Sequence, residues 1–146
     1  PKKAYGATLL SILITDQFIL YLQLGDGDIL SVSGEQVDKL FSDQEEKLGT
    51  ATNSLCMTEP EAYFNLSLQS FKEEKPELIM AATDGYINSF PYDKDFLQVG
   101  RDFLSLAQEE GLAFINKELE NWLVETSQEG SGDDITVGLI FRRNAI

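Results

Sequence analysis

The pattern of apolar and polar positions predicts strands in the first third of the chain. Residues Gly6–Ile14 and Phe18–Gly25 are apolar runs separated by Thr15-Asp16-Gln17, which indicates two strands joined by a hairpin turn. A shorter run, Ile29–Ser33, follows the turn sequence Gly25-Asp26-Gly27-Asp28. We expect this run to complete an antiparallel meander of three strands.

The middle of the chain alternates between polar segments and further strands. Residues Gly34–Lys47 are polar and acidic, and they predict a surface loop containing one helical turn. In Ala62–Leu68 the Phe and Leu side chains fall on one face, which predicts a half-buried strand. Residues Leu78–Ala82 form an unbroken apolar run, typical of a strand buried on both faces, and this run stops at Thr83-Asp84-Gly85.

The last third of the chain has helical spacing. Apolar residues recur with a helical period in Asp93–Glu109 and in Leu112–Thr126, and Gly111 separates the two predicted helices. Their aromatic side chains are expected in the core: Phe96, Phe103, Phe114 and Trp122. A closing strand follows at Ile135–Phe141. Strands first, then helices, then one more strand indicate an α+β domain in which helices are layered on antiparallel sheets.

Carboxylates follow or precede three of the predicted strands. Asp26 and Asp28 lie in one turn, Asp84 follows the buried strand, and Asp133 and Asp134 precede the closing strand. An Asp-Gly turn by itself needs no more than a backbone cap, so these residues could all be turn formers. If the strand ends converge, the like charges favour a divalent cation. Two such ions about 3.5–4 Å apart can activate a water molecule for attack on phosphorus.

The composition excludes several classes of function. The net charge of −14, from 25 acidic and 11 basic residues, repels nucleic acid phosphates and anionic lipid. No run approaches the ~18 apolar residues that a membrane span needs. The single cysteine, Cys56, cannot form an intramolecular disulfide, which favours a reducing, cytoplasmic compartment, and we expect a buried side chain rather than a reactive thiol.

The absence of histidine narrows the chemistry further. Without histidine there is no Ser-His-Asp or Cys-His catalysis, and with one cysteine the usual zinc ligand sets are missing as well. Oxygen ligands remain, and these suit hard ions such as magnesium, manganese or calcium.

Four short motifs resemble those of a known family. Gly25-Asp26-Gly27 is similar to its G-D-S/G turn, and Thr52-Asn53-Ser54-Leu55 to a T-x-S-L segment of its bacterial members. Ala82-Thr83-Asp84-Gly85 resembles its S-D-G strand end, and residues Gly132–Val137 its closing D-N-hydrophobic-S/T-V motif. The family is the metal-dependent protein phosphatase 2C class. The resemblance extends from Tyr5 to Arg142 and implies a β-sandwich flanked by helices in α-β-β-α layers.

The resemblance also implies roles for single residues. Asp84 and Asp133 would hold two catalytic Mn²⁺ or Mg²⁺ ions, Gly85 would add a carbonyl ligand, and Asp26 would help to bind a third ion. Three further residues would lie around these ligands without binding the ions directly: Asp134, Asp28 and Thr83.

The chain departs from the family pattern in two ways. Asp134 stands where the family usually has asparagine, which adds a negative charge. Three features of the family have no counterpart in this chain: an N-terminal acidic residue, a phosphate-binding arginine, and a D-G-x-G motif whose aspartate bridges both metals. Asp16-Gln17 and Asp93-Lys94 both lack the glycine of that motif. We therefore expect a fold that is incomplete at its N-terminus.

Two hypotheses about function follow. In the first, residues 1–146 are the C-terminal portion of a single phosphatase domain. The parent protein hydrolyses phosphoserine and phosphothreonine in phosphoproteins, and a cognate kinase adds these phosphates. Residues 1–146 alone are inactive. In the second, the phosphatase-like fold is a non-catalytic regulatory or binding module. The sequence encoded upstream distinguishes them, because D-G-x-G and an arginine there favour the enzyme.

Two further expectations concern calcium and self-association. A third hypothesis is that the aspartates only form turns or bind calcium. However, the residues after Asp28 alternate as a strand and lack the glutamate of an EF-hand loop. If upstream strands are absent, an exposed sheet edge or apolar face should produce a homodimer or a swapped assembly.

Overall fold

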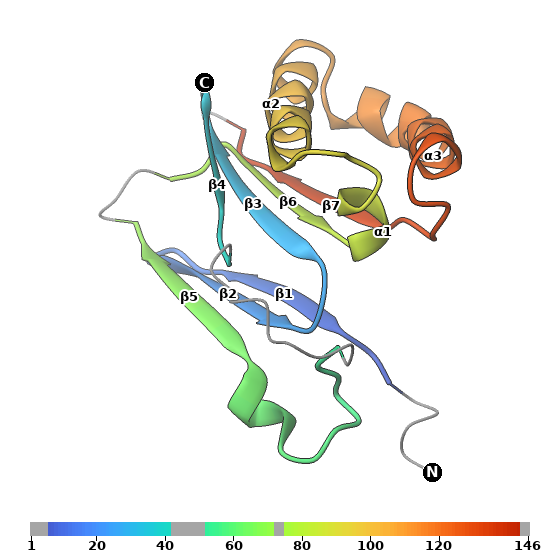
Figure 1. The fold of residues 1–146 in the computed structure, drawn as a ribbon. Coiled ribbons are helices and arrows are strands. Elements are labelled where there is room, and N and C mark those ends of the chain that lie inside the picture. Colours follow the sequence, from blue (N-terminus) through green and yellow to red (C-terminus); the bar gives the residue numbers. More distant parts are fainter. Residues whose placement is uncertain (1–5, 42–51, 72–74, 144–146) are drawn as a thin grey trace. The chain divides into compact units, whose positions relative to one another are not determined.

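A computed structural model describes residues 6–41, 52–71 and 75–143 of the chain. The chain forms two compact units (Figure 1). The first contains Pro1–Asp26 and Phe41–Lys75, and the second contains Gly27–Leu40 and Pro76–Ile146. Each unit has its own antiparallel sheet, and the second also carries the helices that pack on its sheet. The predicted α+β class is therefore confirmed.

The first unit is built on a three-stranded sheet in the order β1-β2-β5. Its strands are β1 (Leu9–Ile14), β2 (Phe18–Leu24) and β5 (Asn65–Ser70). The predicted hairpin is confirmed, since β1 and β2 pair in antiparallel fashion around the turn that follows Thr15. The predicted strand Ala62–Leu68 begins later than expected, because a 3₁₀ helix, η2 (Pro60–Tyr63), precedes β5.

One face of this sheet is apolar and exposed. Leu66 and Leu68 on β5 are each 62% exposed, and Leu13 on β1 is 52% exposed. The strand register places Leu13 and Leu68 on either side of Leu20, so these side chains share a face. The face that was predicted to bury the leucines of β5 is thus open among the described residues.

The second unit contains a four-stranded sheet in the order β4-β3-β6-β7. Its strands are β3 (Asp28–Ser33), β4 (Gln36–Lys39), β6 (Leu78–Ala82) and β7 (Val137–Phe141). Three helices follow β6 along the chain: α1 (Asp84–Ile87), α2 (Asp93–Glu109) and α3 (Leu112–Glu129). The predicted helices and the closing strand are confirmed to within a few residues.

Two predictions about this unit are wrong. Strand β3 does not extend the first hairpin; it pairs with β4 and β6 instead. Its residues from Asp28 to Val32 are all buried, which suits a central strand, and Gly25 (φ 80°) and Gly27 (φ 104°) turn the chain just before it. The predicted polar loop contains the short edge strand β4, and residues 42–47 of that loop lie outside the described residues.

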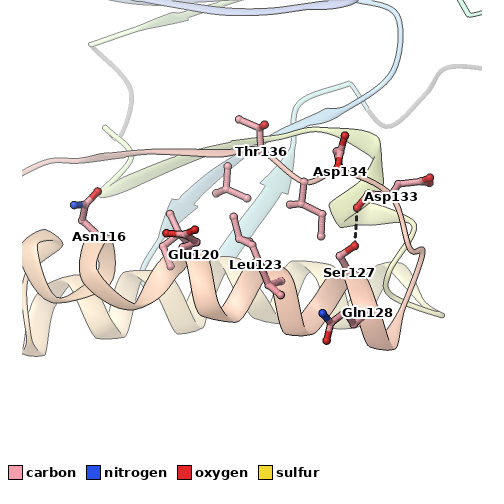
Figure 2. A pocket seen from close by; sticks show the side chains of 12 residues that line it. Asn116, Glu120, Leu123, Ser127, Gln128, Asp133, Asp134 and Thr136 are labelled. Carbon is pink, nitrogen blue, oxygen red and sulfur yellow. Dashed lines mark hydrogen bonds between the residues drawn. The ribbon is translucent and has the colours of Figure 1, made fainter.

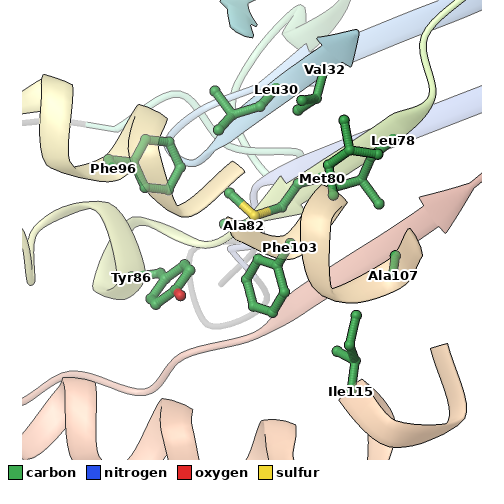
Figure 3. Packing of buried hydrophobic residues seen from close by; sticks show 11 residues of the cluster. Leu30, Val32, Leu78, Met80, Ala82, Tyr86, Phe96, Phe103, Ala107 and Ile115 are labelled. Atoms are coloured by element: carbon green, nitrogen blue, oxygen red, sulfur yellow. The ribbon is translucent and has the colours of Figure 1, made fainter. Parts of the chain in front are cut away.

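The core of the second unit lies between its sheet and α2 (Figure 3). Strands β3 and β6 contribute one side of the core and α2 the other, including Phe96 and Phe103. Burying each such side chain contributes about 1.5–3 kcal/mol. Helix α3 is less buried: Ile115 is its only buried residue among those described, and Phe114 is 38% exposed, contrary to its predicted place in the core.

Candidate functional site

The second unit brings three of the predicted site segments to one end of its sheet. Asp28, the first residue of β3, pairs with Ala82, the last residue of β6. The next residue, Thr83, is joined to the segment before β7: the Thr83 N–H donates to the Thr136 carbonyl (3.0 Å), and the Thr136 N–H donates to Thr83 Oγ1 (2.9 Å). Asp84 and the loop 131–136 therefore lie side by side.

Asp84 is the first residue of the single-turn helix α1. Its carboxylate oxygen Oδ1 accepts a hydrogen bond from the Gly85 N–H (3.0 Å). Gly85 in turn touches the loop before β7: a side-chain carbon at Gly85 would lie 2.5 Å from the Asp134 carbonyl oxygen and 3.1 Å from Asp133 Cβ. This glycine therefore permits the close approach of the two aspartate-bearing segments.

Two serines connect α1 to the loop before β7, and we call Ser89 and Ser131 the hydroxyl clamp. Both hydroxyls donate to the Gly85 carbonyl oxygen at 2.7 Å, and they lie 3.1 Å from each other. The Ser131 hydroxyl also accepts the Asp133 N–H at 3.2 Å. The clamp thus ties the backbone after Asp84 to the backbone of Asp133 through protein groups alone.

The clamp bears on the predicted ligand role of Gly85. A carbonyl oxygen has two lone pairs, and here each hydroxyl of the clamp directs one hydrogen bond to the oxygen of Gly85. Metal ligation by this carbonyl stays a prediction, and it would require at least one of these hydroxyls to turn away.

A groove of about 760 Å³ lies beside the same loop (Figure 2). Residues of α3 line one side and Asp133–Val137 the other. At one end of the groove the Ser127 hydroxyl donates to the Asp133 carbonyl oxygen at 2.7 Å. Asp133 is therefore fixed through both its N–H and its carbonyl, whereas no hydrogen bond is seen to its carboxylate within the described residues.

The Asp28 carboxylate forms an ion pair with a neighbouring lysine. Its carboxylate lies 2.8 Å from Lys39 Nζ, and the Asp28 side chain is 9% exposed. Burial raises the pKa of Asp28 above its ordinary value of 3.8, Lys39 opposes the change, and Asp93 adds to it. The role of Asp28 near a metal stays a prediction, and the structure gives this carboxylate a partner in the sheet.

Asp26 belongs to the first unit. The Thr52 hydroxyl donates to Asp26 Oδ2 at 2.5 Å. Gly25 has a positive φ, and a side chain there would collide with the Asn53 carbonyl and with Thr8. The G-D-G turn and the T-x-S-L segment are thus in direct contact, although Asp26 and Thr52 are 26 residues apart in the sequence.

Tyr86 follows Gly85 but points into the core (Figure 3). Burial raises the pKa of Tyr86 to about 12, and the negative charge of Asp102 adds to the increase. The ring of Tyr86 packs edge-on against Phe90 and Phe96, with centroid distances of 5.3 and 6.1 Å. Tyr86 therefore remains protonated at neutral pH and anchors α1 to the core.

The residues fit a hard divalent ion by type. Asp84 and Asp133 offer carboxylate oxygens, and a magnesium-like ion commonly uses one or two carboxylates and completes its shell with water. In residues 6–41, 52–71 and 75–143, no group of three or more acidic, histidine or cysteine side chains is close enough to form a metal cage. Metal binding by Asp84 and Asp133 stays a prediction.

The serines of the clamp were missed by the sequence analysis. Ser131 lies in Gly130-Ser131-Gly132, which has the composition of a flexible linker. No feature of the sequence marks Ser131. Only the folded structure shows that Gly130 packs tightly, since a side chain there would lie 2.5 Å from Ser89 Cβ.

Comparison with known proteins gives the family. The family model described as protein phosphatase 2C matches residues 1–124. The chain belongs to the protein phosphatase 2C family. The closing motif at residues Gly132–Val137 lies beyond the matched part. No curated protein matches the chain.

Solved structures show the same fold. The chain is similar to the serine/threonine phosphatase Stp1 from Staphylococcus aureus, with a TM-score of 0.66 and 13% identity over 95% of this chain and 57% of that one. For the catalytic domain of the phosphatase PstP, solved with two manganese ions, the TM-score is 0.58 and the identity is 16%, over 92% of this chain and 57% of that one. For the phosphatase domain of SpoIIE from Bacillus subtilis, presoaked with manganese, the TM-score is 0.56 and the identity is 16%, over 99% of this chain and 60% of that one.

The chain spans less than two thirds of the length of each of these structures. That residues 1–146 are the C-terminal portion of a single domain therefore stays a prediction. Within the described residues, none of the helices has the length and apolar character that crossing a bilayer requires.

Proposed function

We propose that this phosphatase 2C chain is part of a metal-dependent serine/threonine protein phosphatase. The reaction would be the hydrolysis of phosphoserine and phosphothreonine in a phosphoprotein, with a cognate kinase as the opposing activity. The observation that carries the proposal is the union of Asp84 and Asp133 at one sheet end by the hydroxyl clamp and the Thr83–Thr136 hydrogen bonds.

The proposed roles follow from the positions of the side chains. Asp84 and Asp133 would hold Mn²⁺ or Mg²⁺, and Asp134 would add negative charge beside them. When bound, two such ions supply an activated water and neutralise the phosphate oxygens. Asp26 would contribute to a further ion, and Thr83 would orient the backbone around Asp84 through its hydrogen bonds to Thr136.

Related structures support manganese as the ion, since two of the similar phosphatase structures were solved with or after exposure to manganese. For the compartment, we infer the reducing cytoplasm because Cys56 is the only cysteine and is a free thiol.

A specific observation favours a second candidate function. The Gly85 carbonyl, a predicted metal ligand, already accepts hydrogen bonds from both hydroxyls of the clamp, which also suits a phosphatase-like module that binds a partner without turnover. Because the D-G-x-G motif has no counterpart in this chain, we expect these 146 residues to bind metal weakly and to be inactive alone.

The first experiment measures Mn²⁺ binding by the free-manganese EPR signal. The chain is compared with Asp84→Asn and with Asp16→Asn, which removes the same charge at the exposed first hairpin. We expect binding by the wild type and by Asp16→Asn, and its loss in Asp84→Asn. Equal binding by all three proteins would show that Asp84 is no ligand, and no binding by any of them would favour the non-catalytic module.

The second experiment measures manganese-dependent hydrolysis of p-nitrophenyl phosphate by the same proteins. Hydrolysis that Asp84→Asn abolishes would establish a complete site in these 146 residues and refute our expectation of a missing segment. Binding without hydrolysis is the expected outcome.

A further inference from the structure

Two sets of hydrogen bonds join the segment around α1 to the loop before β7, one on each side of the aspartates. On one side, the Thr83 N–H donates to the Thr136 carbonyl at 3.0 Å, and the Thr136 N–H donates to Thr83 Oγ1 at 2.9 Å. On the other side, the Ser131 hydroxyl of the clamp donates to the Gly85 carbonyl at 2.7 Å. Asp84 lies between Thr83 and Gly85 along the chain, and the two aspartates of the loop lie between Ser131 and Thr136. Each aspartate-bearing segment is therefore joined to the other on both sides of its carboxylates.

The hydrogen bonds of the clamp form a closed network. A serine hydroxyl has one proton to donate, and both clamp hydroxyls donate to the Gly85 carbonyl at 2.7 Å. Each hydroxyl oxygen also accepts one backbone N–H: Ser89 accepts that of Ser131, and Ser131 accepts that of Asp133, both at 3.2 Å. A polar network whose members are all paired rigidifies the backbone around it. This network does so with neutral groups, so it adds no charge beside the carboxylates.

The packing of two glycines leaves little room for these segments to shift. A side-chain carbon at Gly130 would lie 2.5 Å from Ser89 Cβ, and one at Gly85 would lie 2.5 Å from the Asp134 carbonyl oxygen. Backbone therefore lies directly against the neighbouring segment at both positions. The placement of the loop against α1 is set by this packing as well as by the hydrogen bonds.

The backbones of both predicted metal ligands are held in this way. The Asp133 N–H donates to Ser131, and its carbonyl accepts the Ser127 hydroxyl at 2.7 Å (Figure 2). The Asp84 carbonyl accepts the Asn88 N–H at 2.8 Å. The carboxylates thus project from two backbones whose spacing is held by protein groups.

A fixed spacing of ligands matters more to some ions than to others. Magnesium requires near-octahedral geometry with bonds of about 2.0–2.1 Å, whereas calcium accepts six to eight ligands at about 2.3–2.6 Å in flexible arrangements. Loosening a pair of carboxylates should therefore cost more affinity for the ion with strict geometry than for calcium. The rigidity of a site is in this sense a determinant of its ion selectivity.

We propose that Ser89 and Ser131 are positioning residues that hold Asp84 and Asp133 at a spacing suited to Mn²⁺ or Mg²⁺, and that they thereby select these ions over Ca²⁺. The serines act through the backbone of the residues they contact and are not themselves ligands. The inference rests on the proposed function, because it takes the two aspartates as the ligands of the ion.

The experiment measures Mn²⁺ affinity by the free-manganese EPR signal, and Mg²⁺ and Ca²⁺ affinities by competition with Mn²⁺. Ser131→Ala is compared with the wild type, with Asp84→Asn and with Ile115→Val, which removes one methyl group from a buried core residue. We expect Ser131→Ala to weaken the binding of Mn²⁺ and Mg²⁺ by about tenfold or more, and that of Ca²⁺ by less. Ile115→Val should leave all three affinities unchanged. A general loss of folding would weaken the binding of every ion to the same extent, so the ratio of affinities identifies a positioning role.

Hydrogen exchange of the Asp133 amide tests the clamp in the metal-free protein. Ser131→Ala removes the acceptor of this N–H, so the amide should exchange about fivefold faster or more. Ser89→Ala also removes two hydrogen bonds of the clamp but keeps this acceptor, so it should accelerate exchange of the Asp133 amide less. Equal exchange in the wild type and Ser131→Ala would overturn the inference without reference to any ion.

The outcomes separate this inference from the proposed function. If Asp84→Asn loses Mn²⁺ binding but Ser131→Ala binds as the wild type does, or keeps its ratio of Mg²⁺ to Ca²⁺ affinity, the positioning role is overturned and the proposed function stands. If Asp84→Asn binds Mn²⁺ as tightly as the wild type, or if the wild type binds none, the proposed function and the positioning role are both overturned.

Discussion

Replacing Gly85 with alanine tests whether α1 is held directly against the loop before β7. The new side-chain carbon would lie 2.5 Å from the Asp134 carbonyl oxygen and 3.1 Å from Asp133 Cβ. Neither atom is the free end of a flexible side chain, so the loop or α1 must move. Because the clamp hydroxyls bind the carbonyl of the same glycine, the movement also strains their hydrogen bonds.

The expected cost combines two effects of opposite sign. Forcing an extra carbon into a packed site costs about 1–3 kcal/mol. Alanine in a helical position gains about 0.5–1 kcal/mol over glycine, and Gly85 lies within α1. We therefore expect Gly85→Ala to lower the free energy of unfolding by about 1–2 kcal/mol, and the midpoint of thermal unfolding by about 2–8 °C.

Gly138→Ala is the matched control. Gly138 lies in the neighbouring strand β7, and a side-chain carbon there would meet nothing within 4 Å. This variant should be as stable as the wild type, or more stable by about 0.4–1 kcal/mol. Urea unfolding followed by circular dichroism gives both values, and equal slopes would show that the denatured state is unchanged. If Gly85→Ala were as stable as Gly138→Ala, the contact between α1 and the loop would be refuted.

Three further predictions address the clamp, the buried ion pair and self-association. Ser131→Ala should lower the free energy of unfolding by about 1–2 kcal/mol in urea, because two hydrogen bonds are lost; a loss no larger than that of the exposed Ser105→Ala would contradict this. Burial raises the pKa of Asp28, so wild-type stability relative to Asp28→Asn should be greatest below pH 3.8 and fall as pH rises through the raised pKa; a pH-independent difference in urea unfolding would argue against it. Light scattering should detect a dimer that Leu66→Lys with Leu68→Lys dissociates, and a wild-type monomer would exclude self-association.

The sequence predicted those elements whose pattern is local. The first hairpin, the buried strand β6 and the helices α2 and α3 each have a periodicity or a turn signal that few other structures satisfy. The partner of β3 could not be predicted in this way, because a short apolar strand fits a meander and a second sheet equally well. Strand β4 was missed because Val37 is its only apolar residue.

The candidate site was predictable only in part. The position of Asp84 and Asp133 at strand ends follows from the apolar runs beside them, and the structure brings their backbones together. The clamp could not be predicted, because a serine between two glycines has the composition of a flexible segment. Its order arises from long-range contacts, with Ser131 bonded to a residue 46 positions earlier.

The turn Gly25-Asp26-Gly27-Asp28 shows how tertiary contacts assign different roles to similar neighbours. Asp26 accepts a hydrogen bond from Thr52 in the first unit, whereas Asp28 pairs with Lys39 in the second. The positive charge of Lys39, 2.8 Å from the Asp28 carboxylate, offsets the negative charge of Asp28 near the strand ends.

The remaining acidic side chains of the second unit's site are Asp84, Asp133 and Asp134. Hydrogen bonds between protein groups fix both backbones: the Asp84 carbonyl accepts the Asn88 N–H, and the N–H and carbonyl of Asp133 bond to Ser131 and Ser127. The separation of the two backbones is therefore set by protein groups, and an ion held by the two carboxylates alone would have to order only those side chains. Such preorganisation lowers the conformational entropy lost on binding. If the clamp has this function, Ser131→Ala should lower the free energy of manganese binding by more than it lowers the free energy of unfolding.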